Sequence, residues 1–134
     1  MSQESVRVVR RILRSVNDQD IDSALLDLDP DAELDWSGSE APDSGVFRGH
    51  AGWREWMAGR REGLSGVRFD ITEVIDTHAD RLVTVVHVQS RGRASGIEIA
   101  SVGAGVWTLR GGKVTRLTLY QSRADALKAV GLKQ

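Results

Sequence analysis

The chain has 134 residues, of which 40% are hydrophobic and 28% charged, and its 19 acidic and 18 basic side chains give a formal net charge of −1. This length predicts one soluble domain (1–134) with a single core, and the balanced charge argues against a nucleic-acid partner. Cysteine is absent and histidine occurs only three times, so thiol chemistry and Cys-ligated metals are excluded and we expect neither a metal nor a cofactor. No segment has the apolar length of a signal-peptide core or a membrane span, which predicts a cytoplasmic protein without a membrane partner.

The N-terminal part of the chain has the pattern of two helices followed by a strand. Residues 6–16 place apolar side chains at helical spacing with arginines between them, which predicts an amphipathic helix. Asp20 is expected to cap a second, short helix that Pro30 closes. Residues 32–36 alternate between apolar and acidic side chains and predict a short strand. The polar loop 37–45 that follows is long enough to form a rim or lid.

A third helix is expected from His50 to Glu62, because glycines flank a run that carries tryptophans on one side. The period then changes to that of strands. Four strands are expected, at about Val67–Thr77, Arg81–Arg91, Ile97–Leu109 and Lys113–Gln121. A final helix, Arg123 to Val130, completes the chain. Helices followed by a meander of strands indicate an α+β fold.

Three stretches carry a resemblance to a known family. Residues 8–36 contain the helix, the Asn-x-x-Asp break and the Asp-Ala strand start; residues 47–56 read FRGHAGWREW; and residues 112–132 end in an Ala-Leu-x-Ala-x-Gly-Leu tail. In this order they resemble the nuclear transport factor 2-like superfamily and its SnoaL-like polyketide cyclase and ketosteroid isomerase-like branch. The resemblance implies a cone-shaped, curved antiparallel sheet around a pocket, with three N-terminal helices and a short C-terminal helix. It also implies a homodimer through the outer face of the sheet.

The same resemblance argues against one activity within the superfamily. Ketosteroid isomerases use an aspartate base and an oxyanion hole made of a tyrosine and a protonated aspartic acid. Carried over by position, the tyrosine falls on Ile12, the base on Trp36 and the buried acid near Gly105. None of these residues can exchange a proton from a side-chain oxygen, so steroid isomerisation by that mechanism is rejected.

Aromatic and small residues are the candidates for the pocket walls. In the strand 97–109, one row carries Ser101, Gly103 and Gly105 beside a tryptophan, and such glycines either allow the sheet to bend or leave room for a ligand. Tryptophans are more often core residues than ligand contacts, but those facing the interior would favour a flat, apolar ligand with a few oxygens. The candidate wall residues are Trp36, Trp53, Trp56, Ser101 and Trp107.

His87 lies in an otherwise apolar strand and is the side chain best suited to proton transfer at neutral pH. Its row continues to Arg91, a cation that could bind an enolate or a carboxylate. The resemblance, however, suggests that the other row, with Thr84, Val86 and Val88, faces the pocket. His87 would then lie on the outer face, unless a bulge reverses the alternation.

Three further residues are candidates for acid/base work, each with an ordinary alternative. Asp35 precedes the lost base position, but the alternation points it away from Trp36. Glu98 could act as an acid or base if buried, and otherwise pairs with an arginine across the strands. The Tyr120 hydroxyl could donate to a substrate oxygen or merely hold the last helix.

These candidates leave three hypotheses open. The first is a cofactor-independent acid/base enzyme, of isomerase, cyclase or hydratase type, that acts on an apolar, oxygen-bearing polyketide, terpenoid or steroid-like molecule. The second is a protein that binds such a molecule without turnover. The third is a dimerisation module whose working surface is the outer sheet face.

Overall fold

The computed structural model describes residues 3–38, 44–77 and 80–132. The central part of the loop predicted as a rim or lid, residues 39–43, lies outside this description. Within the described residues, four helices and six strands follow the order α1 (Gln3–Asn17), α2 (Ile21–Leu25), β1 (Leu28–Asp35), β2 (Val46–Arg48), α3 (Gly49–Gly63), β3 (Leu64–Asp76), β4 (Arg81–Gly92), β5 (Glu98–Arg110), β6 (Lys113–Tyr120) and α4 (Arg123–Ala129). The predicted α+β class is confirmed.

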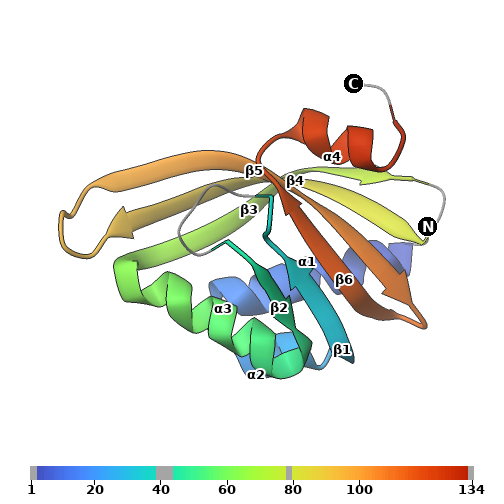
Figure 1. Ribbon diagram of the computed structural model, residues 1–134, viewed down its shortest axis with the longest axis horizontal. Helices are drawn as coiled ribbons and strands as arrows, with labels where there is room; N and C mark the ends of the chain where they lie inside the picture. Colours follow the sequence, from blue (N-terminus) through green and yellow to red (C-terminus); the bar gives the residue numbers. More distant parts are fainter. Residues whose placement is uncertain (1–2, 39–43, 78–79, 133–134) are drawn as a thin grey trace.

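The strands form one curved, open sheet in the order β2-β1-β6-β5-β4-β3. Helices α1, α2 and α3 lie on one side of this sheet, and α4 lies on the other (Figure 1). We call these sides the inner and the outer face. The β4–β5 hairpin projects past the helices as an arm (Figure 1), and Ile97 and Ile99 on it are 64% and 46% exposed.

The first strand corrects two details of the sequence interpretation. Pro30 does not close the second helix, which ends at Leu25, but lies inside β1. It is tolerated there because the pairing of β1 with β6 shifts register between Leu28 and Glu33, so no ladder bond is lost at the proline. β1 also runs parallel to β6, whereas the other pairings are antiparallel. Because long segments separate these two strands in the chain, their pairing need not have hairpin geometry.

Asn17, which the sequence marked only as a helix break, joins α1 to the sheet. Its side-chain Nδ2 donates to the Phe69 carbonyl and its Oδ1 accepts from the Phe69 amide, both at 2.8 Å. These bonds satisfy backbone groups of β3 that no neighbouring strand reaches, since β3 is an edge strand. The end of α1 is therefore fixed against Phe69.

The main core lies between the inner face and helices α1 to α3. It contains Ile12 of α1 and Leu34 of β1, both fully buried, and Trp53 of α3, which is 1% exposed. A second, smaller cluster lies on the outer face beneath α4 and contains Val83, Ala104, Val106 and Ala126.

Helix α4 is held against the outer face by its cap and by an ion pair. The Ser122 hydroxyl accepts from the Asp125 amide at 3.1 Å, which caps the helix. Arg123 then pairs with Glu73 of β3 at 2.8 Å, and this hydrogen bond lowers the pKa of the Glu73 carboxyl. No helix among the described residues is long and apolar enough to cross a membrane.

Candidate functional site

A cavity of ≈ 360 Å³ lies on the inner face of the sheet. Its walls come from α1, α3 and strands β3 to β6, and most of them are apolar. The lining residues are Leu13, Trp36, Trp56, Arg60, Phe69, Thr84, Val86, Val88, Ser101, Val102, Gly103, Ala104, Gly105, Trp107, Leu117, Leu119, Tyr120 and Gln121. The row with Thr84, Val86 and Val88 faces it, as the resemblance implied.

The buried polar groups of the cavity centre on tryptophans. Trp107 is 2% exposed, and its Nε1 donates to the hydroxyl of Thr84, itself 1% exposed, at 2.9 Å. Trp56 is 6% exposed, and among the described residues its buried Nε1 has no hydrogen-bond partner. Each indole has one donor and no acceptor. The Trp107 donor is engaged by Thr84, so of these two donors the Trp56 Nε1–H is the unpaired one among the described residues.

Arg60 is the one charged side chain among the described residues that line the cavity. It lies one helical turn after Trp56 on α3, and its guanidinium carbon is 5.4 Å from the Trp56 ring centroid and 5.7 Å from that of Phe69. Both distances fall within the range of a cation–π interaction. The two rings therefore hold a positive charge at the cavity wall.

Gly103 and Gly105 of β5 have different effects on the cavity. A Cβ added to Gly105 would lie 3.0 Å from Leu117 Cδ1 and 3.4 Å from Trp107 Nε1, so the absence of a side chain there lets Trp107 lie close to the strand. A Cβ on Gly103 would meet only ordinary contacts, the nearest at 3.7 Å. Gly103 thus leaves space in the cavity that a larger side chain could occupy.

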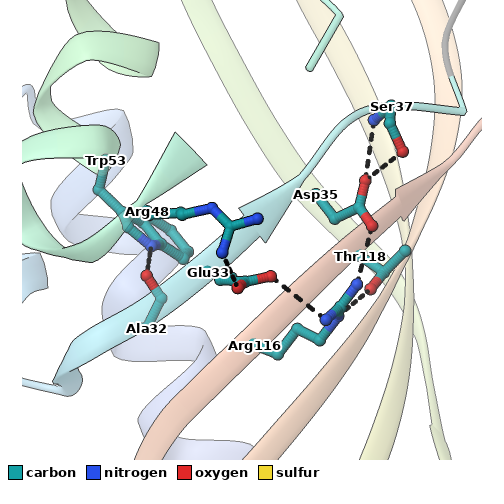
Figure 2. Close-up of polar contacts among 8 residues, drawn as sticks. All are labelled: Ala32, Glu33, Asp35, Ser37, Arg48, Trp53, Arg116 and Thr118. Atoms are coloured by element: carbon teal, nitrogen blue, oxygen red, sulfur yellow. Dashed lines mark hydrogen bonds and ion pairs between the residues drawn. The ribbon is translucent and has the colours of Figure 1, made fainter. Parts of the chain in front are cut away.

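Asp35 does not line the cavity but belongs to a ladder of charges on the outer face (Figure 2). Arg116 pairs with Asp35 at 2.8 Å and with Glu33 at 3.2 Å, and the Ser37 amide donates to Asp35 at 2.9 Å. Burial by itself would raise the pKa of Asp35, but the hydrogen bonds from Ser37 and the charge of Arg116 outweigh it and lower this pKa. Asp35 is thus an ionised carboxylate already engaged by its neighbours.

The other predicted acid/base groups also lie outside the cavity lining. His87 pairs across the strands with Val102 on the row opposite to Val86, and its Nδ1 is 3.4 Å from the Gln89 amide nitrogen. Glu98 forms an ion pair with Arg91 at 2.7 Å on the arm. Glu98 and Arg91 border a separate hollow of ≈ 580 Å³. Their proposed roles as catalytic or oxygen-binding groups remain predictions.

Tyr120 lies at the border between the two faces. It lines the cavity, yet its register partner is Ala104 and it packs against the outer cluster beneath α4. Of the two roles considered for Tyr120, this packing favours the one in which it holds the last helix.

Trp53, which was predicted as a pocket wall, lies in the main core outside the lining, where its Nε1 donates to the Ala32 carbonyl at 3.2 Å (Figure 2).

The structure thus brings Trp36, Trp56, Ser101 and Trp107 together at one cavity. Sequence reasoning missed Arg60 there, although its place one turn after Trp56 on the expected helix was a usable signal.

Residues 9–117 match the family model of the SnoaL-like domain. The chain belongs to this family. No match is found among the curated proteins. Solved structures show the same fold at low identity. TerC, co-crystallized with polyporic acid, is 23% identical with a TM-score of 0.79, over 96% of this chain and 98% of TerC.

Two further structures bear other descriptions. A ketosteroid isomerase-like fold protein from Catenulispora acidiphila, in complex with trimethylamine, is 15% identical over 93% of this chain and 92% of its own, with a TM-score of 0.75. A candidate polyketide cyclase from Xanthomonas campestris is 16% identical over 96% and 97%, with a TM-score of 0.72.

In this SnoaL-like domain, two of the three positions that the resemblance matched to isomerase groups line the cavity, namely Trp36 and Gly105, and the third, Ile12, is buried in the main core. Neither an imidazole nor a carboxylate occurs among the described lining residues. The described lining therefore offers mainly apolar contact rather than a pair of proton-transfer groups.

Proposed function

We propose that this SnoaL-like domain binds a flat, apolar, oxygen-bearing small molecule, of polyketide, terpenoid or steroid-like type, in the cavity on the inner face. The observation that carries the proposal is a cavity of ≈ 360 Å³ with tryptophan walls, next to which the buried Trp56 Nε1 has no partner among the described residues. Aromatic rings supply broad apolar contact, and a few fixed donors orient the oxygens of a ligand. A protein with the same fold, TerC, has been co-crystallized with polyporic acid.

The site favours binding over the acid/base chemistry expected from His87, Asp35 and Glu98. These residues lie outside the lining, and Asp35 is committed to Arg116 and Ser37. If the protein is an enzyme of isomerase, cyclase or hydratase type, Tyr120 is the acid/base candidate at the cavity. The test is Tyr120→Phe, which in an enzyme of this kind should abolish turnover of a bound ligand and retain its binding.

A thermal-shift screen against steroids, terpenoids, aromatic polyketides and their carboxylic acids tests the binding proposal. A ligand at a concentration about a hundred times its Kd should stabilise the fold by about 2.7 kcal/mol, which raises the Tm by several degrees. A flat response across the panel, with the protein folded, would contradict the proposal.

We further propose that the outer face joins two copies of the chain in a homodimer. The proposal follows the resemblance described above. Val102, which is 57% exposed on this face beside the half-buried His87, is an apolar side chain that such an interface would cover. Val102→Asp should therefore yield a monomer in light scattering. Leu26→Asp, at a residue that is 75% exposed after α2, should leave the dimer intact.

A further inference from the structure

Strand β5 has a free edge where it forms the arm. It has a neighbour on both sides only as far as Ala104, which pairs with Tyr120 at the end of β6. From there toward the tip of the arm (Figure 1), β5 continues to Glu98 and pairs with β4 alone. Residues 98–102 are exposed, and among the described residues no strand lies along this edge.

Two hydrogen bonds show which backbone groups face the free edge. The Gly92 amide donates to the Ile97 carbonyl at 3.0 Å, and the Leu109 amide donates to the Asp80 carbonyl at 2.9 Å. Odd-numbered residues therefore direct their backbone groups toward the β4 side at both ends of the hairpin, and no register shift interrupts the pairing between them. Because backbone groups alternate between the two sides of an antiparallel strand, those of the even-numbered residues point away from β4. The residues whose groups point to the free edge are Glu98, Ala100 and Val102.

An unpaired edge of this kind is a template for another strand. The exposed apolar side chains of the arm add to this tendency, since Ile97, Ile99 and Val102 are 64%, 46% and 57% exposed. The edge reads Glu-Ile-Ala-Ser-Val-Gly over residues 98–103 and contains neither proline nor lysine, which commonly protect an edge from pairing.

We propose that two copies of the chain join along this edge, with the two β5 strands antiparallel and centred on Ala100. Ala100 then lies opposite Ala100 of the second copy, and Glu98 lies opposite Val102. Each free amide meets a free carbonyl, so the two sheets continue into one another. No like charges meet across the pairing, because Glu98 faces a valine and its carboxylate is already paired with Arg91 at 2.7 Å.

The ends of the free edge determine this register. A shift of two residues would place Val102 opposite Gly96 or Glu98 opposite Ala104. The Gly96 amide is already bonded within its own turn, and Ala104 already pairs with β6. The register centred on Ala100 is therefore the one that gives all three free residues a free partner.

The same register matches an exposed side chain to a position without one. Ile97 of one copy lies opposite Gly103 of the other, so both are on the same face of the joined sheet. A Cβ on Gly103 would meet its nearest heavy atom only at 3.7 Å. The isoleucine, exposed in a single chain, thus meets open space in the second copy.

This contact differs from the outer-face dimer proposed above, because it bonds backbone groups at a sheet edge and does not cover a sheet face. A chain that makes both contacts belongs to an assembly of more than two copies. In a closed assembly, loss of the edge contact halves the mass whether or not the outer face also pairs. Val102→Asp would place a second acid opposite Glu98 and should break both contacts, so a different substitution is needed to separate them.

Hydrogen exchange on the full wild-type chain tests the edge contact without a substitution. The amides of Ala100 and Val102 should exchange slowly where the protein is assembled, and about tenfold faster once it is diluted to monomers. The amides of Ser101 and Gly103, which point toward β4, are the internal reference and should stay protected throughout.

Ala100→Pro removes the central amide of the contact. The fold should tolerate this substitution, because that amide faces the free edge and edge strands accept proline. Light scattering should then give half the wild-type mass. Ala100→Val is the matched control: it changes the same side chain but keeps the amide, and it should keep the wild-type mass.

The outcomes separate the two contacts. Wild-type mass in Ala100→Pro, or fast exchange at Ala100 and Val102 in the assembled protein, would overturn the edge contact and leave the outer-face dimer standing. A wild-type protein that is monomeric at every concentration would overturn both, and the edge would then be open to a strand from another protein. Neither experiment involves a ligand, so the proposed binding function is tested separately.

Discussion

The two faces of the curved sheet differ in how their polar groups are paired, although the same strands form both faces. On the outer face, Arg116 is matched to Asp35 and Glu33 in a self-contained ladder. On the inner face, donors lie among apolar walls, and the Trp56 indole has no partner among the described residues. In the outer ladder these charged groups satisfy one another, whereas the inner face buries a donor that no described residue satisfies. This difference supports the proposal that the ligand site lies on the inner face.

The largest expected effect concerns the buried hydrogen bond of the inner face. Thr84→Val keeps the shape of the side chain but leaves the Trp107 indole without its acceptor, which should lower the free energy of unfolding by about 2 kcal/mol. Urea denaturation measures this. Thr118→Val is the same substitution on the outer face, where the hydroxyl accepts from the exposed Arg116 at 3.2 Å. It should cost less than about 0.5 kcal/mol, and equal losses would contradict the contrast between the faces.

A second substitution fills the inner cavity without disturbing the sheet. Gly103→Val places a β-branched side chain where a Cβ meets only ordinary contacts at 3.7 and 3.9 Å. The fold should tolerate it, but overpacking of the occupied cavity should reduce affinity for a ligand found in the thermal-shift screen about tenfold. Calorimetry on this variant is compared with Ala100→Val, which also introduces a valine, at an exposed position of β5. Unchanged affinity in Gly103→Val would place the ligand elsewhere.

The sequence was sufficient for the fold because the hydrophobic periods were clear in most elements. It predicted α3 within one residue at each end, and the alternation correctly placed Asp35 opposite Trp36. It could not show that Asn17 binds the backbone of β3 at Phe69, because that contact joins residues distant in the chain. The same limit applied to the site. Residue type singled out His87 and Glu98, whereas the lining depends on strand register, which an isolated sequence does not fix.

The charged ladder should give the outer face a distinctive acid dependence. The pKa of Asp35 is lowered from its ordinary value of 3.8, so the folded state binds this proton less readily than the unfolded state. Asp35 therefore contributes stability above that value, and the contribution is lost as the pH falls through it. At neutral pH, Asp35→Asn should lower the free energy of unfolding by about 1 kcal/mol.

Denaturation at several pH values measures this difference, which should shrink below the ordinary pKa. Asp80→Asn removes an exposed carboxyl and serves as the control, because a surface substitution of this kind should change the free energy of unfolding by less than about 0.5 kcal/mol. A difference between wild type and Asp35→Asn that persisted undiminished in acid would show that the Arg116 pairing is not what stabilises Asp35.

The smallest expected effect tests the alternation itself, with two neighbouring residues of β4. His87→Ala alters the outer row and should leave affinity for a ligand found in the thermal-shift screen unchanged, with a stability change within about 0.5 kcal/mol. Val86→Ala alters the inner row, where Val86 lines the cavity, and should weaken binding of the same ligand several-fold through lost contact. Because a slip of one residue exchanges the faces of a strand, the opposite result would mean that β4 presents His87 to the ligand. That result would restore His87 as the leading candidate for proton transfer.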